Sequence, residues 1–242
     1  MPASPATPFA AEPGARSSAD PVSWWLLAAL GVVVYAAALV AALPARLVVP
    51  RGVDAAGTVW RGEAALGSGH VAAWHASLLD SLGSAGVAGR WTIDGPGSAV
   101  EGAARWGPFA GVGLDAVRGR IGWPLVALAA PSLPFACDFG SHLALDRVAL
   151  APKHQAASGS LTTEAGSCSG RLAGAARAVP RLVATFVTSG DRTTATVTPW
   201  ANRAQPLADL TLENGVLRLH TTAAGAALIP GSTGASDLEI EL

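Results

Sequence analysis

The chain has 242 residues, a formal net charge of −1 and only 14% charged residues. This near-neutral balance excludes nucleic-acid binding driven by bulk charge, which needs a strongly basic surface. Because half of the residues are hydrophobic, a membrane segment has to be sought before the fold is interpreted. Residues 1–21 are rich in proline, alanine and serine and show no periodicity, which predicts a disordered tail.

Residues 22–43 form the longest apolar run, VSWWLLAALGVVVYAAALVAAL, and contain no charged residue. As an α-helix this run would be about 33 Å long, enough for a hydrocarbon core of ~30 Å. Trp24 and Trp25 lie at its start, and tryptophan favours the membrane–water interface. Pro21 and Pro44 flank the run, as expected for a helix that stops at both ends. We therefore predict a transmembrane helix rather than a buried core helix.

Two fates are open for this segment. A secretory signal has a basic start and an apolar core of about 7–15 residues, whereas this run is longer and lacks the basic start. We expect an uncleaved anchor for this reason. The small residues Ala41, Ala42 and Ala45 keep cleavage as the alternative.

The remainder, residues 44–242, is predicted to be one mainly β domain. Short runs punctuated by glycine between residues 89 and 121 indicate strands with tight turns. Residues 125–130 are apolar and end at Pro131, which predicts a short helix. Residues 181–200 are expected to form a hairpin turning at 189–191. Alternating runs flank Asn214 and Gly215, the strongest short-range hairpin signal, and residues 237–242 alternate as a last strand. The predicted fold is an antiparallel, elongated or groove-like sheet with one polar face.

Cys137 and Cys168 are the only cysteines, so a disulfide can form in one way within the chain. Two independent buried thiols are the alternative. Residues 166–170 also read Gly-Ser-Cys-Ser-Gly, like a nucleophile elbow, but that motif needs a buried strand before it and a helix after it. The preceding residues 158–164 are polar. We therefore expect no enzyme activity and treat a cysteine hydrolase as a minor alternative.

The remaining residue types carry little chemistry in their spacing. The five histidines form no metal-binding motif, and His70 and His75 would point to opposite faces of a strand. We expect the histidines to be solvated and the protein to use neither a metal nor another cofactor. The tryptophans outside the apolar run are expected to lie mostly in the core, with one or two lining an apolar groove: Trp60, Trp74, Trp91, Trp106, Trp123 and Trp200.

A compact motif follows the apolar run, made of Gly57, Thr58, Val59, Trp60, Gly62 and Ala64. Thr, Val and Trp are strand formers, and the two glycines suit turn or bulge positions. A structural strand edge is as good an interpretation as a binding role. Together with Leu43-Pro44-Ala45 before it and Trp74 after it, the motif is similar to the start of the periplasmic part of the type II secretion system protein N family.

The resemblance implies a non-enzymatic scaffold, an accessory component of the machinery that exports folded proteins across the outer membrane. Its partners would be the inner membrane and other type II secretion components. Arg46, Arg51 and Arg61 follow the apolar run and only Arg16 precedes it, which would favour a cytoplasmic C-terminal part. The expected disulfide and the resemblance instead favour a single-pass inner-membrane protein with a periplasmic domain.

The alternative function is a membrane-tethered periplasmic carrier that holds lipid or another apolar ligand in a β groove. A continuous, solvent-open apolar face would favour this carrier. A closed core with exposed strand edges would favour the scaffold.

Overall fold

The structure of the chain is a computed structural model. It describes residues 21–47, 49, 52–77, 80–81, 86–107, 111–151, 155–170, 176–230 and 234–241. Apart from Pro21, the tail expected at 1–21 lies outside the described residues. The chain divides into two compact units, Met1–Ala42 and Leu43–Leu242.

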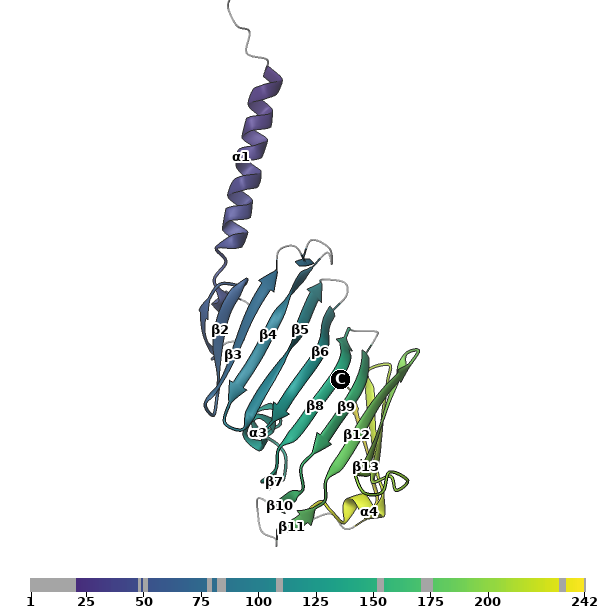
Figure 1. Cartoon of the computed structure of the whole chain (residues 1–242). Coiled ribbons are helices and arrows are strands. Elements are labelled where there is room, and N and C mark those ends of the chain that lie inside the picture. The colour runs from purple at the N-terminus through teal and green to yellow at the C-terminus, as the bar shows by residue number, and fades with distance from the viewer. Residues whose placement is uncertain are drawn as a thin grey trace, which may run out of the picture. The chain divides into compact units, whose positions relative to one another are not determined.

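The described part of the first unit contains helix α1 (Pro21–Ala41), drawn in purple in Figure 1. Its stretch Trp24–Ala41 is long and apolar enough to cross a membrane, and its length and composition fit either a single span or a signal sequence. The helix ends two residues before the predicted Leu43. Leu43 is instead held by the second unit, because its carbonyl oxygen accepts a 3.0 Å hydrogen bond from Val59 N.

The second unit is built on an antiparallel sheet of 13 strands, whose spatial order follows the order of the chain. This confirms the prediction of a mainly β fold with an antiparallel sheet. The early strands are β1 (Asp54–Gly57), β2 (Arg61–Gly67), β3 (His70–Ser77), β4 (Val87–Gly95), β5 (Ser98–Gly107) and β6 (Gly111–Ile121). The later strands are β8 (Ser141–Leu150), β9 (Gln155–Thr163), β12 (Leu182–Ser189), β13 (Arg192–Pro199), β14 (Ala208–Glu213), β15 (Val216–Thr221) and β16 (Ser236–Glu241).

A second sheet of three short strands lies beyond the ends of β8 and β9 (Figure 1). Its strands, in spatial order, are β11 (Arg177–Val179), β10 (Gly166–Gly170) and β7 (Phe135–Cys137). The unit also contains the short helices η1 (Ala45–Leu47), α3 (Trp123–Ala129) and α4 (Ala223–Ala226). Helix α3 is the helix predicted at 125–130, shifted so that it begins just before Pro124, which suits the first turn of a helix.

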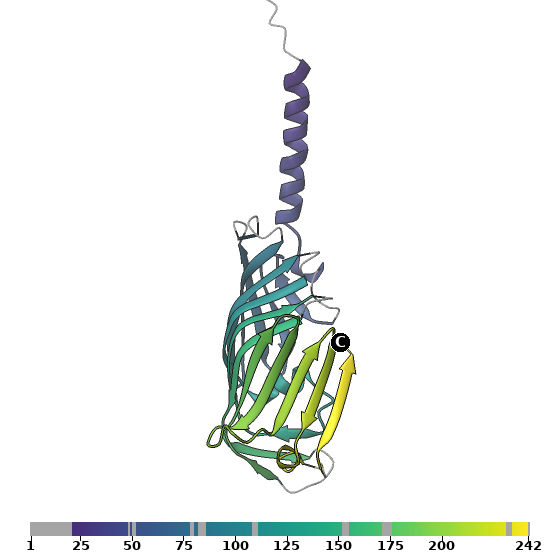
Figure 2. The ribbon, with the colours of Figure 1, turned by 90° about the vertical axis from the view of Figure 1, so that its right-hand side faces the viewer.

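The large sheet is not flat, and it turns a corner between β9 and β13 (Figure 2). Bulges shift the register of β5 against β6 and of β8 against β9, and bulges increase local twist and bending. At the corner, the Oγ1 atoms of Thr188 and Thr193 lie 3.1 and 3.2 Å from Ala157 N. These bonds reach from β12 and β13 to β9, so they mark the concave side of the sheet.

The predicted hairpins are present. Residues 182–199 form β12 and β13 with a turn at Gly190, whose φ is +61°. Asn214 and Gly215 join β14 to β15 with φ values of 53° and 80°, as a two-residue hairpin turn of this kind requires.

Candidate functional site

The concave side of the large sheet carries apolar side chains from almost every strand. Successive side chains of a strand point to opposite faces, and the strand register fixes which ones share a face. Trp74 lies opposite Trp91, Leu143 opposite Leu161, and Leu210 opposite Leu219. We call this surface the apolar face, and its larger members are Trp74, Trp91, Ile93, Leu114, Leu143, Leu145, Val148, Leu161, Phe186, Leu210, Leu212, Leu217 and Leu219.

No charged side chain occupies the apolar face among the described strand residues of the large sheet. The register assigns the paired ones to the opposite face, and Asp146, which is unpaired in the bulge of β8, contacts Arg118 of that opposite face. Polar side chains on the apolar face are few and include His70 and Ser98, which contact each other, and Thr188 and Thr193 at the corner. A surface of this kind attracts apolar matter and offers little to an ionic substrate.

The apolar face is only partly covered. Most of the hydrophobic residues that are fully buried in the sheet are small, such as Ala64, Ala88, Val100, Val117 and Ala195. Among the described residues, the one large side chain with less than 2% of its surface exposed is His70. The large members of the apolar face are half-buried, and Trp106 on the same face of β5 is 55% exposed. Because these large apolar side chains share one face and stay partly exposed, this face is the candidate binding surface of the second unit.

One end of the apolar face is partly covered. There the small sheet, α3 and α4 stand over the ends of β12–β15 and form a half-open cavity of about 260 Å³. Apolar residues of the small sheet and its flanks line one side, and residues of the large sheet and the segment after α4 line the other: Trp123, Phe135, Phe139, Leu207, Leu219 and Leu228. The cavity therefore extends the apolar face into a deeper apolar end.

A disulfide joins Cys137 of β7 to Cys168 of β10, which confirms the predicted pairing. Both sulfur-bearing residues are buried with Val179, and Trp123 and Phe135 pack against them. The bond lies in the wall of the cavity, so it fastens the small sheet that partly covers the apolar face. Because Cys168 is bonded and lies within a strand, residues 166–170 provide neither the thiol nor the strand–turn–helix of a nucleophile elbow.

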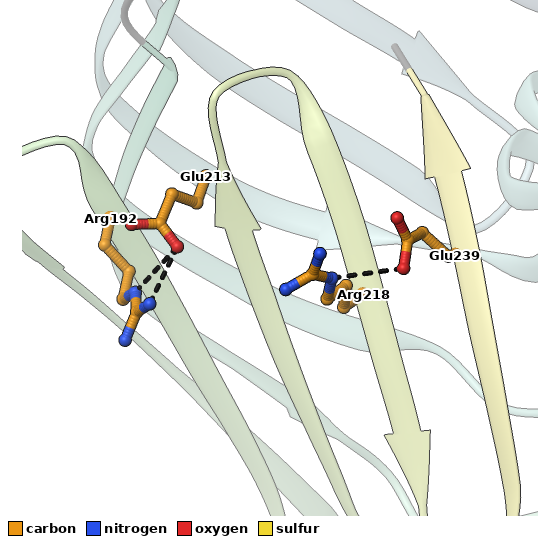
Figure 3. Close-up of polar contacts among 4 residues, drawn as sticks. All are labelled: Arg192, Glu213, Arg218 and Glu239. Carbon is orange, nitrogen blue, oxygen red and sulfur yellow. Dashed lines mark hydrogen bonds and ion pairs between the residues drawn. The ribbon is translucent and has the colours of Figure 1, made fainter.

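The opposite, outer face of the sheet carries cross-strand ion pairs. Figure 3 shows two of them on the later strands, Arg192 with Glu213 at 2.7 Å and Arg218 with Glu239 at 3.1 Å. The hydrogen bond to Glu213 raises the pKa of Arg192 above its usual value. On the earlier strands, Asp115 contacts two arginines, as described below. This face is the polar face that the alternation of the sequence predicted.

The outer face continues to the edge of the small sheet, where Glu164 accepts a 3.0 Å hydrogen bond from Arg120. Desolvation on its own would raise the pKa of Glu164. The charge of Arg120 and the hydrogen bonds from Gly140 N, Arg120 and His142 outweigh it and hold the pKa below the usual value. In Asp138, the hydrogen bond from Ser167 N lowers the pKa. These groups lie on the outside of the small sheet and its flanks and do not face the cavity.

The motif at 57–64 forms the turn between β1 and β2. Gly57 has a φ of +91°, and Thr58 Oγ1 lies 3.2 Å from Arg61 N. Trp74 Nε1 donates hydrogen bonds to the carbonyl oxygens of Thr58 and Val59, and a Cβ on Gly62 would lie 2.5 Å from the Trp74 ring. Ala64 is buried beyond the turn, and Trp60 is half-buried. The spacing of the motif is therefore accounted for by a turn built around Trp74.

Two expectations from the sequence are wrong. His70 is not solvated but 1% exposed, with its Nε2 atom 3.3 Å from Ser98 Oγ. His75, on the outer face as predicted, accepts a hydrogen bond from Arg61 Nε. The tryptophans of the second unit are not mainly core residues, since Trp106 and Trp200 are exposed and the others are half-buried. For Trp74, Trp91 and Trp106 the reason is that they lie on the apolar face, which no second layer covers among the described residues.

One contact was not foreseen. The sequence did not indicate that Arg181 and Arg203 would both lie over the Trp200 ring, 4.0 and 4.7 Å from its centroid. Within the described part of the chain, no three histidine, cysteine, aspartate or glutamate residues gather where they could hold a metal ion. Trp24 and Trp25, predicted at a membrane interface, are exposed near the start of α1.

Comparison with protein-family models, curated proteins and solved structures found no match.

Proposed function

We propose that this protein is a membrane-tethered carrier that holds the acyl chains of a lipid on the apolar face. The observation that carries the proposal is the combination of a 13-stranded sheet with one face on which the described strand residues are uncharged and the large side chains are only half-buried. A soluble domain normally covers such a face with a second sheet or with helices. In this protein the bound ligand would cover the apolar face instead.

An acyl chain suits the apolar face better than a polypeptide does. The backbone N–H and C=O groups of the inner strands are already paired within the sheet, so the face offers side chains only. A peptide lying on it would leave its own polar backbone groups unpaired, at a cost of about 1–3 kcal/mol for each. An acyl chain has no such groups and gains about 0.8 kcal/mol for each CH₂ that it buries.

Helix α1 would keep the carrier at the membrane, from which it takes its lipid. We propose that α1 stays in the inner membrane as a single span and that the sheet lies on the periplasmic side. Tethering raises the effective concentration of the domain at the bilayer surface. The Cys137–Cys168 bond supports the periplasmic side, because disulfides persist in oxidising compartments. Neither a metal nor another cofactor is needed for such a role, and no enzyme chemistry is proposed.

Site-specific photo-crosslinking in intact cells tests the carrier. A photoreactive phenylalanine analogue replaces Leu210 on the apolar face, and the matched control replaces its neighbour Thr211 on the outer face of β14. Both side chains are half-buried, so accessibility does not distinguish them. We expect lipid adducts, identified by mass spectrometry, at position 210 and not at 211. Equal adducts at both positions, or a crosslinked polypeptide at 210, would refute the carrier.

The motif at 57–64 supports a second proposal, an accessory scaffold of the type II secretion system. Its support is the similarity of Gly57, Thr58, Val59, Trp60, Gly62 and Ala64 to the protein N family, placed directly after an apolar helix and before a β domain. The test is purification of the full chain from detergent-solubilised membranes. Other inner-membrane secretion subunits should co-purify, and recovery of lipid alone would leave the carrier and reject the scaffold.

A further inference from the structure

The large sheet has two edge strands, and they are not equivalent. Strand β1 is only four residues long, ends at Gly57 with a φ of +91°, and is followed directly by the bridge between Pro44 and Thr58. Strand β16 is six residues long and pairs with β15 in unbroken register from Ser236 to Glu241. On its other side no strand pairs with it in the described part of the chain.

Natural edge strands avoid unwanted pairing by prolines, bulges, charged side chains or a covering segment. Strand β16 has no proline and no bulge, and its acids Asp237 and Glu239 disfavour pairing with another acidic strand but not with a basic one. At the middle of β16, Leu238 lies on the apolar face opposite Leu219 and is 51% exposed. Another strand alongside β16 would cover this leucine and continue the sheet. The edge is therefore open to pairing, and the apolar side of a partner strand would have to be apolar as well.

One acid on the outer face is paired from both sides. Asp115 on β6 lies between two arginines of the neighbouring strands, 2.7 Å from Arg105 on β5 and 3.5 Å from Arg147 on β8. Glu239 on β16 contacts Arg218, on β15 (Figure 3), and none of the described strands pairs with the other side of β16. Asp237 likewise contacts His220 of β15, at 2.6 Å. The free edge of β16 is thus acidic, and no described strand places a basic residue beside it.

We propose that β16 pairs, edge to edge, with a strand of a partner protein in which arginine or lysine alternates with apolar residues. A basic residue of that strand lies opposite Glu239 on the outer face and gives it the same double pairing that Asp115 has. The apolar residues cover Leu238 on the other face. Backbone hydrogen bonds supply the affinity, and the charge pattern selects the partner. This interaction is independent of lipid binding on the apolar face.

Charge argues against a second copy of this chain as the occupant. Antiparallel pairing of β16 with itself would bring Asp237 and Glu239 of the two copies against one another, and like charges opposite each other destabilise a sheet. Pairing with β1 of a second copy would offer Asp54 and Ala56 on the outer face, neither of which is basic. A different, basic strand is therefore the occupant that fits.

The test uses the full chain in nanodiscs of zwitterionic lipid. The probe is a fluorescent peptide of about six residues, the length of a typical strand, in which arginine alternates with leucine. We expect it to bind and to slow backbone amide exchange in residues 236–241. The variant E239Q should weaken binding about two- to fivefold, the effect of one cross-strand charge pair. The matched control E213Q makes the same change on the interior strand β14 and should leave binding unchanged.

A charge exchange keeps the test independent of any effect on folding. The variant E239R should lose the arginine peptide and gain a peptide in which glutamate replaces arginine. Equal effects of E239Q and E213Q, or slowed exchange on the apolar face rather than in residues 236–241, would overturn the proposal. So would a wild-type chain that dimerises through β16 without any peptide.

Discussion

Removing the Cys137–Cys168 bond should weaken the second unit substantially. The bond closes a segment with a sequence separation of 31 residues. In the chain-entropy model, the unfolded chain loses about 12 cal/mol/K when such a loop is closed, which corresponds to about 3.7 kcal/mol at 25 °C. The free energy of unfolding should therefore fall by about 3–4 kcal/mol in the double variant C137A/C168A. This is a large fraction of the total stability of an ordinary domain.

The position of the bond adds to the expected effect. It joins the small sheet across β7 and β10, and Trp123 packs against the same cluster with its ring 5.8 Å from that of Phe135. The variant also removes two buried sulfur atoms from the wall of the cavity. Loosening should therefore be greatest at the partly covered end of the apolar face.

Urea unfolding of the full chain in detergent, followed by tryptophan fluorescence, measures the change. With a typical slope of about 1–3 kcal/mol per molar urea, the midpoint should fall by about 1–4 M. Reduction of the wild-type chain by a phosphine is the control and should reproduce most of the shift. A midpoint that moves by less than about 0.3 M in both experiments would contradict the expected stabilisation by the disulfide. It would mean that the bond restrains neither the unfolded chain nor the small sheet.

Three further results are expected. Gly62→Val should destabilise the chain by about 1–3 kcal/mol in the same urea assay, because the new side chain would meet the Trp74 ring. The control Gly31→Ala should not destabilise it, because Gly31 has open space around it. Equal effects of the two variants would contradict the packing argument. Because the pKa of Glu164 is lowered in the folded chain, its contribution to stability is present at neutral pH and lost as the pH falls through that lowered pKa. Glu164→Gln should therefore make acid unfolding less steep below about pH 4.3. Acid unfolding curves that do not change would exclude this contribution. Finally, α1 should keep the full chain in membranes during an alkaline carbonate wash, and release of the intact chain would exclude a membrane-spanning helix.

Local patterns in the sequence determined much of this protein. An uncharged run bounded by prolines predicted α1, and alternation with Asn214 and Gly215 predicted the last hairpin, because both signals depend on residues that are neighbours in the chain. The pairing of Cys137 with Cys168 needed only the count of cysteines. Alternation also predicted that the sheet would have one polar face.

Tertiary structure alone decided what happens to the other face. Whether an apolar face is covered depends on where strands distant in the sequence are placed, and the corner between β9 and β13 is fixed by Thr188 and Thr193 reaching Ala157. The same long-range placement buried His70 and set Gly62 against Trp74. It also left β16 at an open edge. A period of two residues states that a strand has two faces, but what lies against each face is set by packing between segments that the sequence keeps far apart.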